Sequence, residues 1–293
     1  MLSYLIPFAL TLAACFGIQT LALRAVGGRT TKSESNFFSS LGRIQAGAQG
    51  QPEIMVLGSS ITGRLPDRAQ GFSGVANMGC DGGSAVDALR AMDHGILPSA
   101  PWIVIEANTL PLALNDKPTE IGRAMQQPWF RVGLKAPCLS ANARPAAFFY
   151  SKLLTRRIGD FGQAGSDSDL EVSSRPHEVT TLPRGEFTPR QRELIDEISG
   201  IIGRLKNQGC RMIFVWLPPA RGVGATPPSL ILGLCRRSES LWWDLGQEAV
   251  PGTVSLTDGV HMAAPSAART MVSLLKGVNH AATSLEMLNA SPR

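Results

Sequence analysis

The sequence contains little that would support a metal centre or a disulfide framework. Its five cysteines form no Cys-x-x-Cys pair, and none has metal-ligand spacing from one of the four histidines. An odd number of cysteines scattered through apolar segments is typical of buried thiols, although an oxidising compartment would allow two of the four after Cys15 to pair. We therefore expect no metal ion and no cofactor.

Excess charge is also small, and no stretch of the chain is strongly basic. The 28 Lys and Arg residues stand against 23 Asp and Glu residues, which gives a net charge of +5. A mild excess spread along the chain disfavours nucleic acid as a partner and weakly favours an anionic membrane surface or a glycan. With 44% hydrophobic residues among 293, the chain is long and apolar enough for one sizeable core.

Charged side chains are absent from the N-terminal stretch at residues 2–23. This run has the length that crosses the hydrocarbon core of a bilayer as one helix, so we predict a single transmembrane anchor over residues 1–26. A cleaved signal peptide would need a basic start that this stretch lacks, and a buried core helix is the other alternative. The Leu-Ala-Ala-Cys sequence ending at Cys15 is similar to a lipoprotein cleavage box, but the apolar run continues beyond it.

Composition divides the rest of the chain into a linker, a domain and a tail. Residues 27–50 are rich in glycine, serine and polar side chains, which is typical of a juxtamembrane linker. A globular domain is expected over residues 51–280, followed by a C-terminal tail at 281–293. A proline-rich stretch at about 111–187 is interpreted as an insertion in the domain, with an amphipathic helix expected at 146–158.

Short apolar runs alternate with helical patterns through the domain. The apolar runs predict buried parallel strands at residues 54–57, 74–78, 102–106, 212–217 and 252–256. The helical patterns lie at residues 84–94, 189–206, 229–248 and 265–276, and Thr188 is a candidate N-cap. The predicted fold class is therefore α/β, with a doubly wound open parallel sheet.

The first predicted strand runs directly into the sequence Gly-Ser-Ser-Ile, which places Ser60 at the carboxyl end of a buried strand. Open α/β sheets bind their ligands at this edge. Taken alone, a Gly-Ser-Ser turn is more often a simple connection from a strand to a helix. The Gly-x-Ser-x-Gly elbow of the α/β-hydrolases is absent around this serine, which argues against that family.

The next two predicted strands end at the same edge of the sheet. The second runs into the sequence NMGCDGG at residues 77–83, where glycine allows the backbone to approach a ligand and point an N–H group at it. The third ends in Glu106-Ala107-Asn108, which places an amide side chain at the edge. Each feature also has an ordinary explanation, a helix-entry turn for the glycines and a capped turn for Asn108.

Asp258 and His261 lie three residues apart, after the last predicted strand and before the last predicted helix. Within one turn, the carboxylate can bond one imidazole nitrogen and fix the tautomer while the other nitrogen faces a serine. Metal binding and a simple surface turn are alternative interpretations of this pattern alone.

Taken in chain order, these four segments resemble the four sequence blocks of the SGNH, or GDSL-like, hydrolase family, over roughly residues 52–278. The last segment, Asp-Gly-Val-His, is the best match. The resemblance implies that Ser60 is the nucleophile and that Asp258 and His261 complete its catalytic triad. It also implies an SGNH or flavodoxin-like sheet and no cofactor.

The same resemblance implies an oxyanion hole, the group of donors that binds the negative charge of the transition state. Its expected members are Ser60, Gly82 and the amide of Asn108, with Gly79 as the alternative to Gly82.

Two segments depart from the family pattern. The first reads Gly-Ser-Ser-Ile where the family name implies Gly-Asp-Ser-Leu, and the third reads Glu-Ala-Asn-Thr where Gly-x-Asn-Asp is usual. The nucleophile is retained. Gly-Ser-Ser variants resemble the branch found in envelope polysaccharide-modifying proteins, and a pseudoenzyme is an alternative.

The expected function is that of a membrane-anchored serine esterase or O-acyltransferase acting through an acyl-serine intermediate. Its expected substrates are O-acyl groups, acetyl above all, on an envelope or exopolysaccharide glycan, and proteins of polysaccharide synthesis are candidate partners. A lipid or thioester hydrolase is one alternative, for which an apolar tunnel is needed. A non-catalytic SGNH-like subunit that binds glycan is another.

The side of the membrane is the last expectation. Arg24, Arg29 and Lys32 follow the apolar span, and the positive-inside rule would keep the domain after them in the cytoplasm. The resemblance to envelope esterases favours the opposite side. We expect a single-pass membrane protein with a periplasmic or other extracytoplasmic domain.

Overall fold

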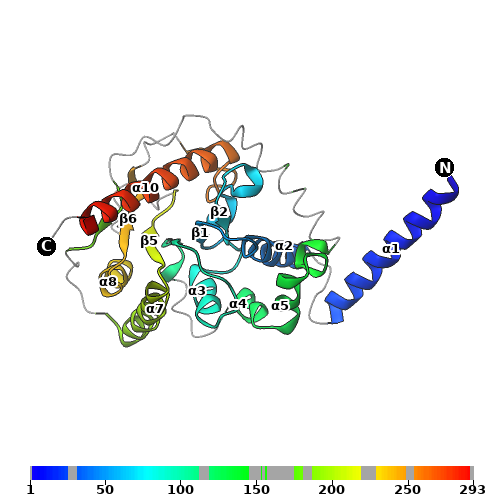
Figure 1. Ribbon diagram of the computed structural model, residues 1–293, viewed down its shortest axis with the longest axis horizontal. Helices are drawn as coiled ribbons and strands as arrows, with labels where there is room; N and C mark the ends of the chain where they lie inside the picture. The colour runs from blue at the N-terminus through cyan, green and yellow to red at the C-terminus, as the bar shows by residue number, and fades with distance from the viewer. Residues whose placement is uncertain are drawn as a thin grey trace.

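The computed structural model describes residues 2–25, 32–111, 119–144, 153, 156, 175–180, 187–218, 229–248 and 254–290. It has an α/β architecture with a six-stranded sheet in the order β2-β1-β3-β5-β6-β4 (Figure 1). The strands are β1 Ile54–Leu57, β2 Val75–Asn77, β3 Trp102–Glu106, β4 His177–Glu178, β5 Arg211–Val215 and β6 Leu241–Trp243. Every pairing is parallel except that of β4 with β6 at one edge.

The central strands are buried on both faces, as their unbroken apolar sequences require. Successive side chains of β1 point to opposite faces, so Met55 and Leu57 enter one hydrophobic cluster while Ile54 and Val56 enter another. The four predicted strands at residues 54–57, 74–78, 102–106 and 212–217 are therefore confirmed as β1, β2, β3 and β5.

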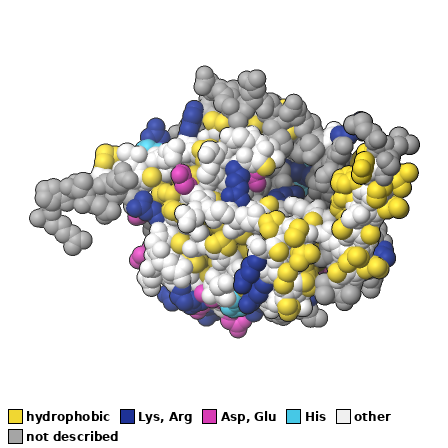
Figure 2. Space-filling model, turned by 45° about the vertical axis from the view of Figure 1, so that its right-hand side comes forward, with side chains coloured by type: hydrophobic (Ala, Val, Ile, Leu, Met, Phe, Trp, Pro, Cys, Tyr) yellow, Lys and Arg dark blue, Asp and Glu magenta, His cyan; other side chains and the backbone are white. Residues whose placement is uncertain are grey.

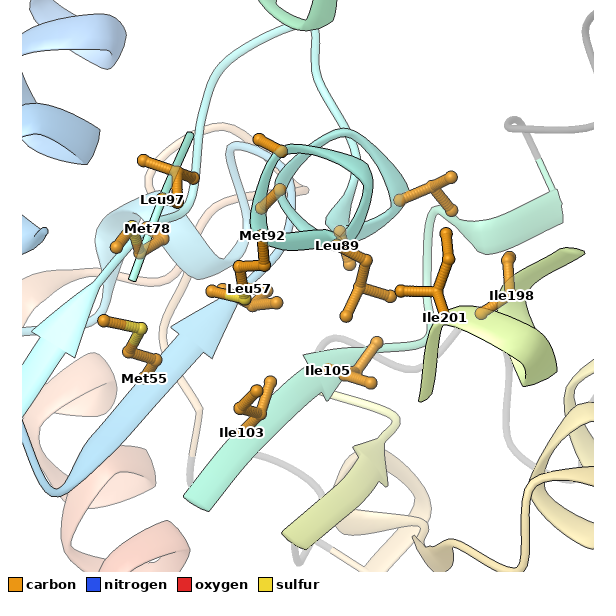
Figure 3. Packing of buried hydrophobic residues seen from close by; sticks show 14 of the residues in the cluster. Met55, Leu57, Met78, Leu89, Met92, Leu97, Ile103, Ile105, Ile198 and Ile201 are labelled. Atoms are coloured by element: carbon orange, nitrogen blue, oxygen red, sulfur yellow. The ribbon is translucent and has the colours of Figure 1, made fainter. Parts of the chain in front are cut away.

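Helices cover the two faces of the sheet. On one face lie α3 Ala85–Asp93, α7 Pro189–Asn207 and α8 Ser229–Arg237, and on the other lies α10 Ala264–Ala290 (Figure 1). Figure 3 shows the first face, where Ile103 and Ile105 of β3 point toward the helices that carry Leu89 and Ile201. Thr188 caps α7 as predicted, because its hydroxyl accepts the backbone N–H of Gln191.

The expected linker is the largest correction to the predicted organisation. Residues 32–47 form α2 Lys32–Gly47, which packs against the domain, while residues 27–31 lie outside the described ranges. Phe38, Leu41 and Ile44 lie on one face of this helix and are buried. This helix was not predicted from the sequence, because most of the segment is polar. Its three buried apolar residues have helical spacing, but they are too few to show a clear pattern.

The predicted helix at 229–248 is also wrong as a single element. It divides into α8, the short strand β6 and α9 Leu245–Glu248. Glu239 interrupts the helix with a φ of 50°, in the left-handed region. β6 thus supplies the fifth parallel strand that was expected at 252–256. Of that stretch, Leu256 makes an isolated antiparallel bridge with Met262, and residues 252–253 lie outside the described ranges.

The expected insertion is partly structured; its helical part packs beside α2, and its strand β4 pairs with β6. It contains α4 Glu120–Met125, α5 Pro128–Lys135, two short 3-10 helices η4 Pro137–Leu139 and η5 Ala141–Ala143, and β4. The amide of Gln45 on α2 ties two of these pieces down, donating to the carbonyl of Phe130 and accepting the N–H of Ala141. Apart from residues 153 and 156, the expected helix at 146–158 lies outside the described residues.

The C-terminal tail predicted at 281–293 is helical through residue 290, because α10 continues to Ala290. Two 3-10 helices, η1 Thr62–Arg64 and η2 Arg68–Gln70, lie between β1 and β2. All five cysteines are free; Cys80, Cys210 and Cys235 are buried and the other two are exposed. Burial raises the pKa of the Cys80 and Cys235 thiols.

The N-terminal helix α1 Leu2–Ala25 is long and apolar enough to cross a membrane over Tyr4–Ala22. Its hydrophobic side chains are exposed and not part of the core, as Figure 2 shows along the right-hand side of the molecule. This excludes the buried core helix as an interpretation. The amide of Gln19 donates to the carbonyl of Cys138, which brings α1 against the η4 segment.

We predict that the anchor and α2 respond differently to truncation. None of the described core residues lies within residues 1–26, so deleting that segment should leave a folded, soluble domain. Deleting residues 1–50 also removes Phe38, Leu41 and Ile44 and exposes the core surface beneath them. Circular dichroism and a thermal unfolding scan of both variants measure this. Equal unfolding midpoints would show that α2 does not belong to the core.

Candidate active site

Ser60 lies where β1 leaves the sheet, as the sequence predicted. The strand ends at Leu57, and the chain then turns so that the N–H of Gly63 donates to the carbonyl of Ser59 at 2.9 Å. Gly58 has to be a glycine here, because a Cβ at this position would collide with Thr62 and Glu106. The tight turn presents Ser60 at the carboxyl edge of the sheet, partly exposed.

The structure brings Ser60, His261 and Asp258 into one hydrogen-bonded chain. His261 Nε2 lies 2.8 Å from Ser60 Oγ, and His261 Nδ1 lies 2.9 Å from Asp258 Oδ2. With the Nδ1 proton held by the carboxylate, the lone pair of Nε2 faces the serine hydroxyl. This is the arrangement in which imidazole acts as a general base toward a serine.

A compact turn fixes Asp258 against His261. The backbone N–H groups of Val260 and His261 both donate to Asp258 Oδ1, at 3.3 and 2.9 Å. Gly259 adopts a φ of 80°, which suits glycine, and the N–H of Thr257 closes the turn on the carbonyl of His261 at 2.8 Å. The Asp-Gly-Val-His sequence therefore folds as one unit that holds the imidazole.

The same bonds keep Asp258 ionised. The backbone N–H of His261, the imidazole and the N–H of Val260 together lower the pKa of Asp258 from 3.8 to about 2, against a smaller opposing effect of burial. Because the pKa is lowered on folding, this carboxylate stabilises the fold above pH 3.8 and loses that contribution as the pH falls toward 2. Near neutral pH the carboxylate is available to orient the imidazole.

Asn108 lies at the end of β3, as expected, and its side chain also forms hydrogen bonds within the fold. Its amide nitrogen donates to the carbonyl of Leu217 at 2.9 Å, and its amide oxygen accepts the Leu217 N–H at 2.8 Å. This pair continues the contact between the ends of β3 and β5. The amide nitrogen carries two hydrogens, so the second remains the candidate oxyanion donor.

The two candidate glycines after β2 have different environments. The N–H of Gly79 donates to Asn77 Oδ1 at 2.8 Å, so it is not available to an oxyanion. Gly79 is required for another reason, because a Cβ there would collide with the backbone of Gly63. Gly82 is exposed with a φ of 72° and open space around its Cα. Of the two, Gly82 is the better candidate donor.

Helix α2 supports the loop that carries both glycines. Arg43 Nη1 donates to the carbonyl of Gly79 at 2.7 Å, and Ser40 Oγ accepts the N–H of Asp81 at 3.1 Å. The N–H of Cys80 donates to the carbonyl of Gly58 at 3.1 Å, which joins this loop to the turn before Ser60. These contributions of α2 were missed from the sequence, because the segment was interpreted as a linker.

The hydrogen bonds of Glu106 were also not predicted from the sequence. Its side chain is fully buried at the end of β3, and its carboxylate accepts hydrogen bonds from Ser59 and Thr62, on either side of Ser60. The available signal was a charged residue closing an otherwise apolar buried strand. Within the described ranges, no three His, Cys, Asp or Glu side chains are grouped so that they could hold a metal ion.

We predict that a fluorophosphonate probe reacts with Ser60 and with no other hydroxyl. Ser60→Ala should abolish labelling, and Asp258→Asn should slow it by about 10³–10⁴, because the imidazole then loses its fixed tautomer. Ser59→Ala is the control, since it removes the neighbouring hydroxyl but keeps the nucleophile. Intact-protein mass spectrometry reads the adduct. Labelling that survives in Ser60→Ala and disappears in Ser59→Ala would contradict the assignment.

Asn108→Ala should have two separable effects. Loss of the oxyanion donor should lower kcat by about 10²–10³ with KM nearly unchanged. Loss of both bonds to Leu217 should lower the free energy of unfolding by about 1–3 kcal/mol, because the backbone groups of Leu217 lose their partner. Steady-state kinetics and denaturant unfolding measure the two. A change in KM alone would limit Asn108 to substrate binding, and unchanged kinetics would leave it only the structural role.

Comparison of the chain with protein-family models, curated proteins and solved structures found no match. The resemblance to the SGNH family therefore depends on the sequence blocks alone. The chemistry of the site is inferred from the geometry of its residues.

Proposed function

We propose that this protein is a serine-dependent ester hydrolase or O-acyltransferase of the SGNH type. The observation that carries the proposal is the chain of contacts from Ser60 Oγ through both imidazole nitrogens of His261 to Asp258, at 2.8 and 2.9 Å. A nucleophile, a base and an orienting carboxylate in this geometry are the parts that acyl transfer requires.

The topology supports a doubly wound SGNH or flavodoxin-like fold. Counted along the chain without the antiparallel edge strand, the parallel strands follow the order 2-1-3-4-5. In this order the connections change direction between β1 and β3, where open α/β proteins bind their ligands. Ser60 follows β1 and Asn108 follows β3, so both flank that position.

The reaction follows from the contacts. His261 Nε2 accepts the proton of Ser60 as Oγ attacks the acyl carbon, and the negative charge on the carbonyl oxygen is bound by the donors at the strand ends. His261 then gives the proton to the leaving alcohol, which departs and leaves an acyl-serine. Water or a sugar hydroxyl attacks this ester in the same way, with His261 again taking and returning the proton.

We propose O-acylated envelope glycan as the substrate, with acetyl as the first acyl group to test. The side chains of His261 and Asp258 are 19% and 33% exposed, so a polymer can reach the triad at the surface. An acetyl group needs no deep apolar cavity. Helix α1 would hold the domain at a membrane as a single-pass anchor, and we propose the extracytoplasmic side, where such glycans are assembled.

We predict that the purified full-length protein hydrolyses p-nitrophenyl acetate faster than p-nitrophenyl esters of longer acids, and releases acetate from acetylated polysaccharide. Ser60→Ala should abolish both reactions. A preference for long acyl chains would instead favour a lipid or thioester hydrolase. A folded protein that binds glycan without turnover or probe labelling would favour the non-catalytic alternative. Transfer is separated from hydrolysis by adding an unacetylated glycan and measuring acetyl groups on it.

A further inference from the structure

We propose that Glu106 is the positioning residue of the nucleophile, and that its carboxylate holds the turn on which Ser60 faces His261. This inference rests on the proposed function, because it concerns how the same site is built. Glu106 makes no contact with the reacting atoms in the hydrogen bonds described below; it acts through the residues on either side of Ser60.

The contacts of Glu106 enclose the nucleophile turn. Glu106 Oε2 accepts the backbone N–H of Ser59 at 2.7 Å and the hydroxyl of Thr62 at 2.7 Å, with the N–H of Thr62 at 3.3 Å. The hydroxyl of Ser59 lies 3.0 and 2.9 Å from the two carboxylate oxygens. One side chain from β3 thus ties together the residue before Ser60 and the second residue after it.

Sheet register explains why this side chain reaches the turn. β1 and β3 pair with Leu57 opposite Ile105, so the next residues, Gly58 and Glu106, lie side by side. Glu106 is completely buried, and the absence of a side chain on Gly58 leaves the space that the carboxylate occupies. The carboxylate therefore sits beneath the turn, where a small displacement would move Ser60 Oγ relative to His261.

A carboxylate suits this position because all of its neighbours are donors. Two N–H groups and two hydroxyl groups converge on it, and an ionised carboxylate accepts without donating. A glutamine could keep its oxygen at the place of Oε2, but its NH₂ group would then replace Oε1 and would need the Ser59 hydroxyl as an acceptor instead of a donor. The uncharged amide oxygen also accepts more weakly than an ionised carboxylate, so we expect glutamine to hold the turn less firmly and Ser60 to be displaced.

The two departures from the SGNH sequence pattern have a common explanation in these contacts. The family pattern carries an acid immediately before the nucleophile and a glycine two residues before the asparagine. This chain has Ser59 and Glu106 at the same two positions. The Ser59 hydroxyl lies within 3.0 Å of both oxygens of Glu106, so in this chain the acid beside the nucleophile turn comes from the end of β3 and not from the turn itself. We infer that this one buried carboxylate, supplied from the neighbouring strand, takes the place of the acid in the family pattern.

The experiment compares Glu106→Gln with the wild type as full-length protein in detergent. Displacing a reacting atom by about 1 Å can cost about 10²-fold in rate, so we expect kcat on p-nitrophenyl acetate and the fluorophosphonate labelling rate of Ser60 to fall by about that factor. KM should change little. Ile201→Ala is the control, because it destabilises a buried position of α7 away from the site and should leave the labelling rate of folded protein unchanged.

A carboxylate exchange provides the second arm. Glu106→Gly should lower the labelling rate at least as much as Glu106→Gln, and Ser59→Asp alone should also lower it by placing two acids together. Combining Ser59→Asp with Glu106→Gly should restore labelling above either single variant.

The outcomes separate this proposal from the proposed function. If Glu106→Gln is labelled at the wild-type rate, the positioning role is overturned. If the double variant is labelled no faster than Glu106→Gly, the exchange of the acid is overturned. If the wild-type protein itself is not labelled at Ser60, the proposed function fails instead.

Discussion

The hydrogen bond between Ser60 and His261 joins two parts of the chain that are 201 residues apart. It forms only because the sheet places the end of β1 next to the Asp258–His261 turn, which precedes α10. The turn carries its own internal bonds, and α10 packs across the opposite face of the sheet from α3 and α7. The arrangement of Ser60, His261 and Asp258 therefore depends on packing on both faces of the sheet.

Residues outside Ser60, His261 and Asp258 also hold the site in place. Glu106 accepts hydrogen bonds from residues on either side of Ser60, while Arg43 and Ser40 on α2 bond to the loop that contains Gly82. α2 is the next described helix after α1 along the chain, so the helix that follows the proposed anchor in sequence is also one that supports the site. In physical terms, preorganised donors are effective only when neighbouring packing keeps them in place.

Much of the fold was predictable from local sequence, because buried parallel strands are unbroken apolar runs and four of them were found in this way. β6 was not, because it follows α8 with little separation and its residues were included in the helical pattern at 229–248. α2 was missed because three apolar residues decide its packing within a polar segment. Asp258 and His261 were predicted together from their spacing, which a single turn converts into a contact.

The contacts of Glu106 could not be predicted in the same way, because they require the parallel register of β1 with β3 as well as a glycine at position 58. The double pairing of Asn108 with Leu217 likewise depends on the adjacency of β3 and β5. Local sequence identifies groups capable of chemistry. Which of them meet is decided by strand order and register, and these are properties of the whole sheet.

The central claim is that Ser60 carries the acyl group during turnover, and acid quenching during the reaction with p-nitrophenyl acetate tests it directly. Peptide mass spectrometry of the quenched protein should find an acetyl group on Ser60, and none in His261→Ala under the same conditions. Turnover without acetylation of Ser60, or with the acetyl group on another residue, would contradict the account.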